Sequence, residues 1–320
     1  MTNIDPLKNK SAWQAATKAI RGGIDRSPHG EISEALYLTS GYAYDSAEQA
    51  AARMSGDEEG FVYSRYGSPT VRMLEERLAL IEGAEACRIT ASGMGAISSA
   101  IIAPLTQGDR VVAARALFGS CRWIITNLIP KYGVEVEFVD GADMEAWKQA
   151  LSKPTKLVLI ESPANPLLDG VDIAAVADLT HKAGGLLIVD NVFASPVLQK
   201  PLEFGADIVV YSATKHMDGQ GRVLAGALLG PQSVIEEIYD PYLRHTGPAA
   251  APFNAWIVLK GLETLELRVR AMSETARQLA DIIATHPNIE AVRYPTRPDH
   301  PHYAVHMKQM QAGGSLIAFS

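Results

Sequence analysis

Short apolar runs alternate with amphipathic stretches through the middle of the chain. The apolar runs predict buried strands at residues 110–114, 134–139, 156–160, 186–189, 208–211 and 225–229. Helical spacing of apolar residues predicts helices over residues 71–81, 92–101, 123–130 and 173–182. Because strands and helices alternate, we expect an α/β fold in which helices cover both faces of a large, mostly parallel sheet.

The pattern changes near residue 255. Two long helical stretches are predicted over 255–269 and 271–284, followed by a strand-like segment at 289–293 and a Pro/His-rich loop. We therefore expect a large domain over residues 61–255 and the start of a smaller α+β domain over residues 256–320. Residues 1–60 have weak apolar periodicity, which favours an N-terminal arm that contacts a neighbouring subunit.

Composition excludes several classes of protein. The chain has 320 residues, 47% hydrophobic and 20% charged, with a formal net charge of −7 and no Lys/Arg run. A nucleic-acid or anionic-membrane partner is therefore disfavoured. The longest apolar stretches are too short to span a bilayer. The two cysteines are expected to be reduced thiols, and we expect a soluble, cytoplasmic protein.

Candidate chemistry gathers after two of the predicted strands. The run 186–189 is followed by Asp190, and the run 208–211 is followed by Ser212, Thr214 and Lys215. Carboxyl ends of parallel strands line one crevice, so these groups should meet there. An amine that forms an imine, an acid for a ring nitrogen and hydroxyls for a phosphate are what pyridoxal 5′-phosphate requires. A loop-capping Asp190 and a solvated Lys215 are the plainer alternatives.

Other motifs are less specific. The turn Ser92-Gly93-Met94-Gly95 could bind a phosphate at a helix start, or simply begin a helix. The glycines of 219–226 precede a strand and do not match a dinucleotide-binding turn. His300, His302 and His306 could bind a metal, but solvated histidines in a Pro-interrupted surface loop are favoured, and no metal is expected.

Several motifs in one order carry a family resemblance. They are the loop 63–70 (Tyr-Ser-Arg-Tyr-Gly-Ser-Pro-Thr), the turn 92–94, the segment 161–168 (Glu-Ser-Pro-Ala-Asn-Pro-Leu-Leu), Val189-Asp190-Asn191 and the segment 211–216 (Tyr-Ser-Ala-Thr-Lys-His). With them, the whole chain resembles the pyridoxal-phosphate enzymes of cysteine and methionine metabolism, the cystathionine γ-synthase and γ-lyase family of fold type I.

The resemblance implies a role for each matching residue. Lys215 would hold the cofactor as an imine, and Asp190 would bind its ring nitrogen. Tyr63 and Arg65 would reach the phosphate from the adjacent subunit, which implies a homo-oligomer with shared active sites, a dimer of dimers. Asn165 would lie beside the substrate carboxylate and the ring hydroxyl. The other phosphate ligands would be Gly93, Met94, Ser212 and Thr214.

Two departures from the family pattern narrow the implied activity. Phe118 stands where the family usually has a tyrosine stacked on the cofactor ring, and it cannot transfer a proton, so acid–base work falls to Lys215, Tyr63 or another group. The sequence after the lysine, residues 216–226, is most similar to the O-succinylhomoserine sulfhydrylase branch. That branch implies γ-replacement on an O-acylated homoserine by sulfide, giving homocysteine for methionine biosynthesis.

Three alternatives stay open at this point. Cystathionine γ-synthase and a methionine or cystathionine γ-lyase belong to the same family, and a catalytically silent module with the same fold is a non-enzymatic alternative. The family's arginine for the substrate α-carboxylate lies beyond Ser320, so we expect the chain to be a truncated form of the fold.

Overall fold

A seven-stranded sheet forms the centre of the computed structural model, which describes residues 10 to 320. Its strand order is β1-β7-β6-β5-β4-β2-β3, and β7 runs antiparallel to both of its neighbours while the other pairs are parallel. The strands are β1 (Ala86–Thr90), β2 (Arg110–Ala114), β3 (Glu135–Val139), β4 (Leu157–Glu161), β5 (Leu186–Asp190), β6 (Ile208–Ser212) and β7 (Gly226–Gly230). The expected α/β fold with a mostly parallel sheet is confirmed.

Strand β1 was missed by the sequence analysis. Its residues Ala86–Thr90 include the charged Arg88, which interrupts the apolar run. In the fold, Arg88 is paired with Asp240 (Nε to Oδ1, 2.6 Å), and the strand is held by antiparallel pairing to β7. Both partners lie more than 130 positions away in the chain, so no local pattern could indicate them.

Helices cover both faces of the sheet. Val112 and Ala114 of β2 belong to the core on one face, and Val111 and Ala113 belong to the core on the other. This alternation is the two-residue period of a strand that is buried on both sides. The helices of this part are α3 (Pro69–Glu82), α4 (Gly93–Ile102), α5 (Gly119–Trp123), α6 (Met144–Ala150), α7 (Ile173–Lys182), α8 (Ser195–Leu198), α9 (Gln232–Val234) and α10 (Asp240–Thr246).

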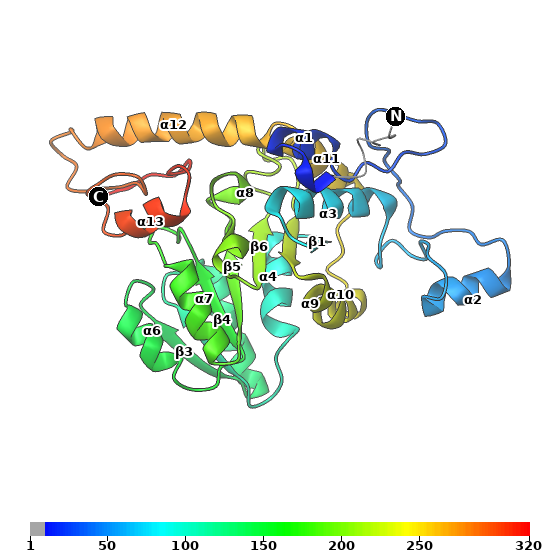
Figure 1. Ribbon diagram of the computed structural model, residues 1–320, viewed down its shortest axis with the longest axis horizontal. Helices are drawn as coiled ribbons and strands as arrows, with labels where there is room; N and C mark the ends of the chain where they lie inside the picture. Colours follow the sequence, from blue (N-terminus) through cyan, green and yellow to red (C-terminus); the bar gives the residue numbers. More distant parts are fainter. Residues whose placement is uncertain (1–9) are drawn as a thin grey trace, which may run out of the picture.

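The C-terminal part differs in detail from its prediction. Helices α11 (Pro252–Leu262) and α12 (Leu265–Ile283) are separated at residues 263–264, and not at residue 270 as expected. Helix α12 lies along one side of the molecule, and α13 (Tyr303–Gln309) lies beneath it beside the end of the chain (Figure 1). The segment at 289–293 contributes only the short strand β8 (Val292–Arg293), which pairs with β9 (Ala318–Phe319).

The domain division stays a prediction, because the boundary expected near residue 255 falls inside α11. That helix packs on α3 of the large part.

The N-terminal arm divides into two parts, and residues 1–9 lie outside the described range. Helix α1 (Ala15–Arg21) packs on α3 of the same chain. Arg77 of α3 is fully buried, donates to the carbonyl of Gly22 (2.8 Å) and forms an ion pair with Glu34. By contrast, α2 (Ala47–Ser55) buries no residue and extends away from the sheet (Figure 1). Contact with a neighbouring subunit stays a prediction for the arm.

The histidine-rich segment is folded, and the expectation of solvated side chains was wrong. His300 and His306 are buried, because α13 packs on the loop 164–170. Nε2 of His306 lies 2.9 Å from the carbonyl oxygen of Leu168, and the N–H of Gly170 donates to Nδ1 of His302 at 2.9 Å. Burial lowers the pKa of His306 to about 4. Within residues 10–320, no cluster of His, Cys, Asp and Glu is arranged to bind a metal.

Two further observations concern the same described range. Cys87 and Cys121 are both free and buried. None of the helices in this range is both long enough and apolar enough to cross a bilayer.

Candidate active site

A cavity of about 310 Å³ opens at the carboxyl ends of the central strands. Eight of the residues proposed from the sequence line it: Gly93, Met94, Phe118, Asn165, Asp190, Ser212, Thr214 and Lys215. We call it the Lys215 cavity. The structure therefore brings together residues spread over more than 120 positions of the chain, as the parallel sheet predicts.

Asp190 and Lys215 reach this cavity from adjacent strands. Asp190 is the last residue of β5, and Lys215 follows β6 by three residues. The N–H of Val192 donates to Oδ1 of Asp190 at 3.1 Å. Burial raises the pKa of Asp190 above its usual range, which is the signature of a carboxylate removed from water without a full counter-charge. A protonated ring nitrogen would supply that charge.

The start of α4 forms a close-packed cradle beside Lys215. Ser92 caps the helix by accepting the N–H of Gly95 at 3.0 Å. A Cβ added to Gly93 would lie 2.6 Å from Cβ of Ser212, so only glycine allows the helix start to approach the end of β6 this closely. Helix starts with free N–H groups suit phosphates. The arrangement fits the phosphate of the expected cofactor.

Thr214 is less available than its predicted role requires. Its hydroxyl oxygen accepts the N–H of Ala225 at 3.1 Å and lies 3.2 Å from the carbonyl oxygen of the same residue. This pair of contacts ties the lysine-bearing turn to the start of β7. Phosphate binding by Thr214 stays a prediction.

Phe118 and Asn165 line the cavity from two different loops. Phe118 precedes α5, is 46% exposed and lines the cavity. Asn165 lies in the loop between β4 and α7. An aromatic ring and a buried acid in the lining of one cavity suit a planar aromatic cofactor.

Tyr63 and Arg65 do not reach the Lys215 cavity of their own chain. Arg65 lines a separate hollow of about 410 Å³, where Tyr66 and Arg244 also lie. The guanidinium of Arg65 lies 5.5 Å from the centroid of the Tyr63 ring. Their separation from Lys215 is what a contribution to a neighbouring subunit requires, and that contribution stays a proposal.

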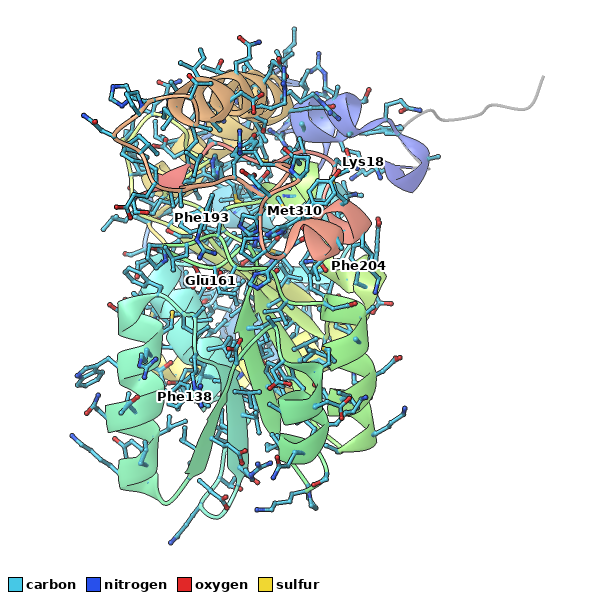
Figure 2. All side chains as sticks on the ribbon, turned by 90° about the vertical axis from the view of Figure 1, so that its left-hand side faces the viewer. Lys18, Phe138, Glu161, Phe193, Phe204 and Met310 are labelled. Atoms are coloured by element: carbon cyan, nitrogen blue, oxygen red, sulfur yellow. The ribbon has the colours of Figure 1, made fainter. Side chains whose placement is uncertain are left out.

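The sequence analysis missed Glu161, the last residue of β4. It lines the Lys215 cavity and is 1% exposed. Its carboxylate accepts backbone N–H groups from both Phe118 and Asn165. A signal was present, because Glu161 ends a predicted strand just as Asp190 ends the next one. Figure 2 shows Glu161 at the end of the sheet that faces the C-terminal segments, in the same region as Phe193, which also lines the cavity.

A buried polar network surrounds Asn191, the residue that follows Asp190. Asn191 donates through Nδ2 to the hydroxyl of Tyr211 (2.7 Å), which donates to Oε2 of Glu82 (2.6 Å). Gln199 donates to Oδ1 of Asn191 (2.8 Å) and to the carbonyl of Ser162 (2.7 Å). These contacts give Asn191 the structural role that the sequence did not indicate.

The fold, together with an amine, a buried acid and a glycine-containing helix start in one cavity lining, points to the class of pyridoxal-phosphate enzymes. Residues 16–320 match the family described as Cys/Met metabolism PLP-dependent enzyme. The chain belongs to this family, and the cofactor is pyridoxal 5′-phosphate. The family resemblance, the enzyme class and the cofactor predicted from the sequence are therefore confirmed.

Similar proteins within this family carry the names of several different activities. The chain is 50% identical to an O-succinylhomoserine sulfhydrylase of Mycobacterium tuberculosis over 95% of its own length and 75% of the relative. It is 40% identical to an L-methionine gamma-lyase of Porphyromonas gingivalis over 95% of this chain and 77% of that one. A crystal structure from Campylobacter jejuni, with a TM-score of 0.91 and 29% identity over 96% of this chain and 85% of that one, carries N'-pyridoxyl-lysine-5'-monophosphate at its position 205.

Proposed function

We propose that the protein is an O-succinylhomoserine sulfhydrylase, which replaces the succinyl group of O-succinylhomoserine by sulfide to give homocysteine and succinate. The observation that carries the proposal is Phe118, a hydrocarbon ring on the wall of the Lys215 cavity. The 50% identity to a relative of that name supports the same activity.

The leaving group explains why Phe118 favours this substrate. A carboxylic acid ionises near pH ~4 and a thiol near pH ~8.5, so succinate can leave as an anion at neutral pH, whereas a thiolate leaves readily only with a proton donor. Phe118 has no proton to give. Burial raises the pKa of Cys121 and Tyr211, which also line the cavity, so both hold their protons tightly.

The chain's own residues then divide the work. The bound cofactor supplies an electron sink for the substrate carbons. Lys215 holds the cofactor, and its amine removes the α-proton and carries protons at Cβ; general acid–base transfer of this kind contributes roughly 10²–10⁴-fold. Asp190 keeps the ring nitrogen protonated, and Asn165 lies beside the substrate carboxylate. Tyr63 of a second subunit is a further candidate for proton transfer.

The proposal includes an assembly and a location. Tyr63 and Arg65 would complete the Lys215 cavity of a neighbouring copy, so the active unit would be a homodimer, as part of a tetramer. The small-molecule partners would be the amino-acid substrate and sulfide, with no nucleic acid or membrane partner. We place the enzyme in the cytoplasm, where this step of methionine biosynthesis would occur.

A substrate panel tests the proposal. Purified protein is given O-succinylhomoserine with sulfide or with cysteine, and separately methionine alone; homocysteine, cystathionine and 2-oxobutanoate are then measured. We expect homocysteine as the main product. Cystathionine as the main product would establish a cystathionine γ-synthase, and 2-oxobutanoate from methionine would establish a γ-lyase.

The variant Lys215→Ala is the control for the site itself. It removes the amine that holds the cofactor, so we expect no turnover and loss of the visible absorbance of the lysine-bound cofactor. A variant with full activity and an unchanged spectrum would refute the assignment of Lys215. Lys153→Ala, at an exposed lysine outside the cavity lining, serves as a charge-matched comparison and is expected to keep the spectrum.

A further inference from the structure

Glu161 binds two separate loops with one carboxylate. Oε2 accepts the N–H of Phe118 at 2.7 Å, and Oε1 accepts the N–H of Asn165 at 2.9 Å. The side chain is almost completely buried at the end of β4. Each carboxyl oxygen accepts one backbone N–H, so this one group can fix both loops to the sheet.

The two loops need such a support. Phe118 and Asn165 are outside regular strands and helices, in connections that follow β2 and β4. Loop positions have few backbone partners of their own and are more mobile than the elements that they connect. A binding site keeps its geometry only when such residues are held by further contacts. For Phe118 and Asn165, that further contact is the same carboxylate of Glu161.

Glu161 also stands next to Asp190. The register of β4 and β5 pairs the two residues directly, and paired residues on neighbouring strands lie about 5 Å apart on one face of the sheet. Burial raises the pKa of Glu161, and the charge of Asp190 raises it further; the two backbone N–H groups oppose both effects. A cation at the Asp190 side of the cavity would favour the ionised form of Glu161 as well.

We propose that Glu161 is a positioning residue, which holds the Phe118 ring over the cofactor and Asn165 beside the substrate through its two backbone hydrogen bonds. The proposal rests on the proposed function, because it assumes that Phe118 stacks on the cofactor ring and that Asn165 faces the substrate. It adds Glu161, which acts through the backbone N–H groups of Phe118 and Asn165.

The variant Glu161→Gln tests the proposal with little change in volume. The amide oxygen can accept one of the two N–H groups, but the NH₂ group then faces the other, so one loop loses its support. We expect the variant to bind the cofactor on Lys215 with unchanged visible absorbance. The visible circular dichroism of the bound cofactor should fall, because it reports the asymmetric stacking of the ring. KM for O-succinylhomoserine should rise about tenfold, as for the loss of one buried hydrogen bond.

Glu82→Gln is the matched control. Glu82 is equally buried and carries the same chemical group, but it does not line the cavity and binds neither Phe118 nor Asn165. A general effect of removing a buried acid would appear in both variants. We expect the circular dichroism and KM of Glu82→Gln to stay at wild-type values.

Two more variants allow the proposal to be tested even if Glu161→Gln does not fold. If Glu161→Gln does not fold, Glu161→Asp takes its place: its shorter side chain keeps the charge but cannot span both N–H groups. Phe118→Leu keeps the backbone N–H and removes the ring. In this variant, the additional replacement of Glu161 should cause no further loss of circular dichroism.

Wild-type circular dichroism and KM in the Glu161 variant that folds would overturn the proposal. A wild-type protein that makes no homocysteine would instead refute the proposed function, because the circular dichroism comparison needs only bound cofactor.

Discussion

The substitution Glu82→Gln should make the protein more stable at alkaline pH. Glu82 ends α3, is 1% exposed and accepts a hydrogen bond from Tyr211, and Oε1 of its carboxylate has no partner among the described residues. Burial raises its pKa from 4.5 to about 8, against the opposing effects of Tyr211 and Lys200. Glutamine resembles the protonated acid, because its oxygen can still accept from Tyr211.

The sign and size of the effect follow from proton binding. In the unfolded chain Glu82 loses its proton near pH 4.5, whereas in the folded protein it keeps the proton to about pH 8. Between these values the folded state binds more protons, so the stability of the wild type falls as pH rises, by about 1.4 kcal/mol per pH unit. Glutamine does not titrate. The gain of the variant over the wild type should therefore grow by roughly 3 kcal/mol between pH 5.5 and 8.5 and stay constant above.

Urea unfolding of both proteins at pH 5.5, 6.5, 7.5 and 8.5 measures this difference. Saturating cofactor is present in every sample, so that its contribution cancels between the two proteins. The exposed variant Glu290→Gln controls for the loss of one negative charge at the surface. A difference in unfolding free energy that is the same at pH 5.5 and pH 8.5 would refute the reasoning.

Three further predictions concern other parts of the molecule. Gly93→Ala should weaken cofactor binding, measured by titration of the visible absorbance, because its Cβ would meet Ser212 at 2.6 Å; Gly95→Ala, whose nearest contact would be 3.4 Å, should not. Phe118→Tyr should raise 2-oxobutanoate production from methionine, because it adds a proton donor to the cavity; an unchanged rate would contradict the leaving-group argument. Arg77→Met should lower the unfolding free energy by about 3 kcal/mol in urea, because Glu34 loses a buried partner.

Much of the fold could be predicted from local patterns. Strand β5 and helix α7 match their predicted ranges closely, because a strand buried on both faces is a continuous apolar run and an amphipathic helix repeats every three or four residues. Strand β1 could not be predicted in this way. Its charged residue Arg88 is neutralised by Asp240, and its backbone is paired by β7, and both contacts arise only in the folded chain.

Some residues of the candidate site could likewise be predicted from local patterns, and others could not. Asp190 and Lys215 could be placed in one crevice because each follows an apolar strand, and parallel strands end on one side of a sheet. Glu161 ends a strand too, but its two N–H partners belong to loops whose positions no residue spacing defines. The burial of His300 and His306 was mispredicted for a similar reason, since α13 packs on a loop more than 130 positions earlier.

By itself, the sequence determined which residue types stand at the ends of the strands, and therefore the class of cofactor and the type of fold. These features depend on local order along the chain, where apolar periodicity and the ends of strands can be read directly. Only the tertiary structure decided which buried carboxylates share the cavity wall, which loops they hold and how far their pKa values move. Those properties depend on burial and on distances between segments far apart in the chain, and both exist only after folding.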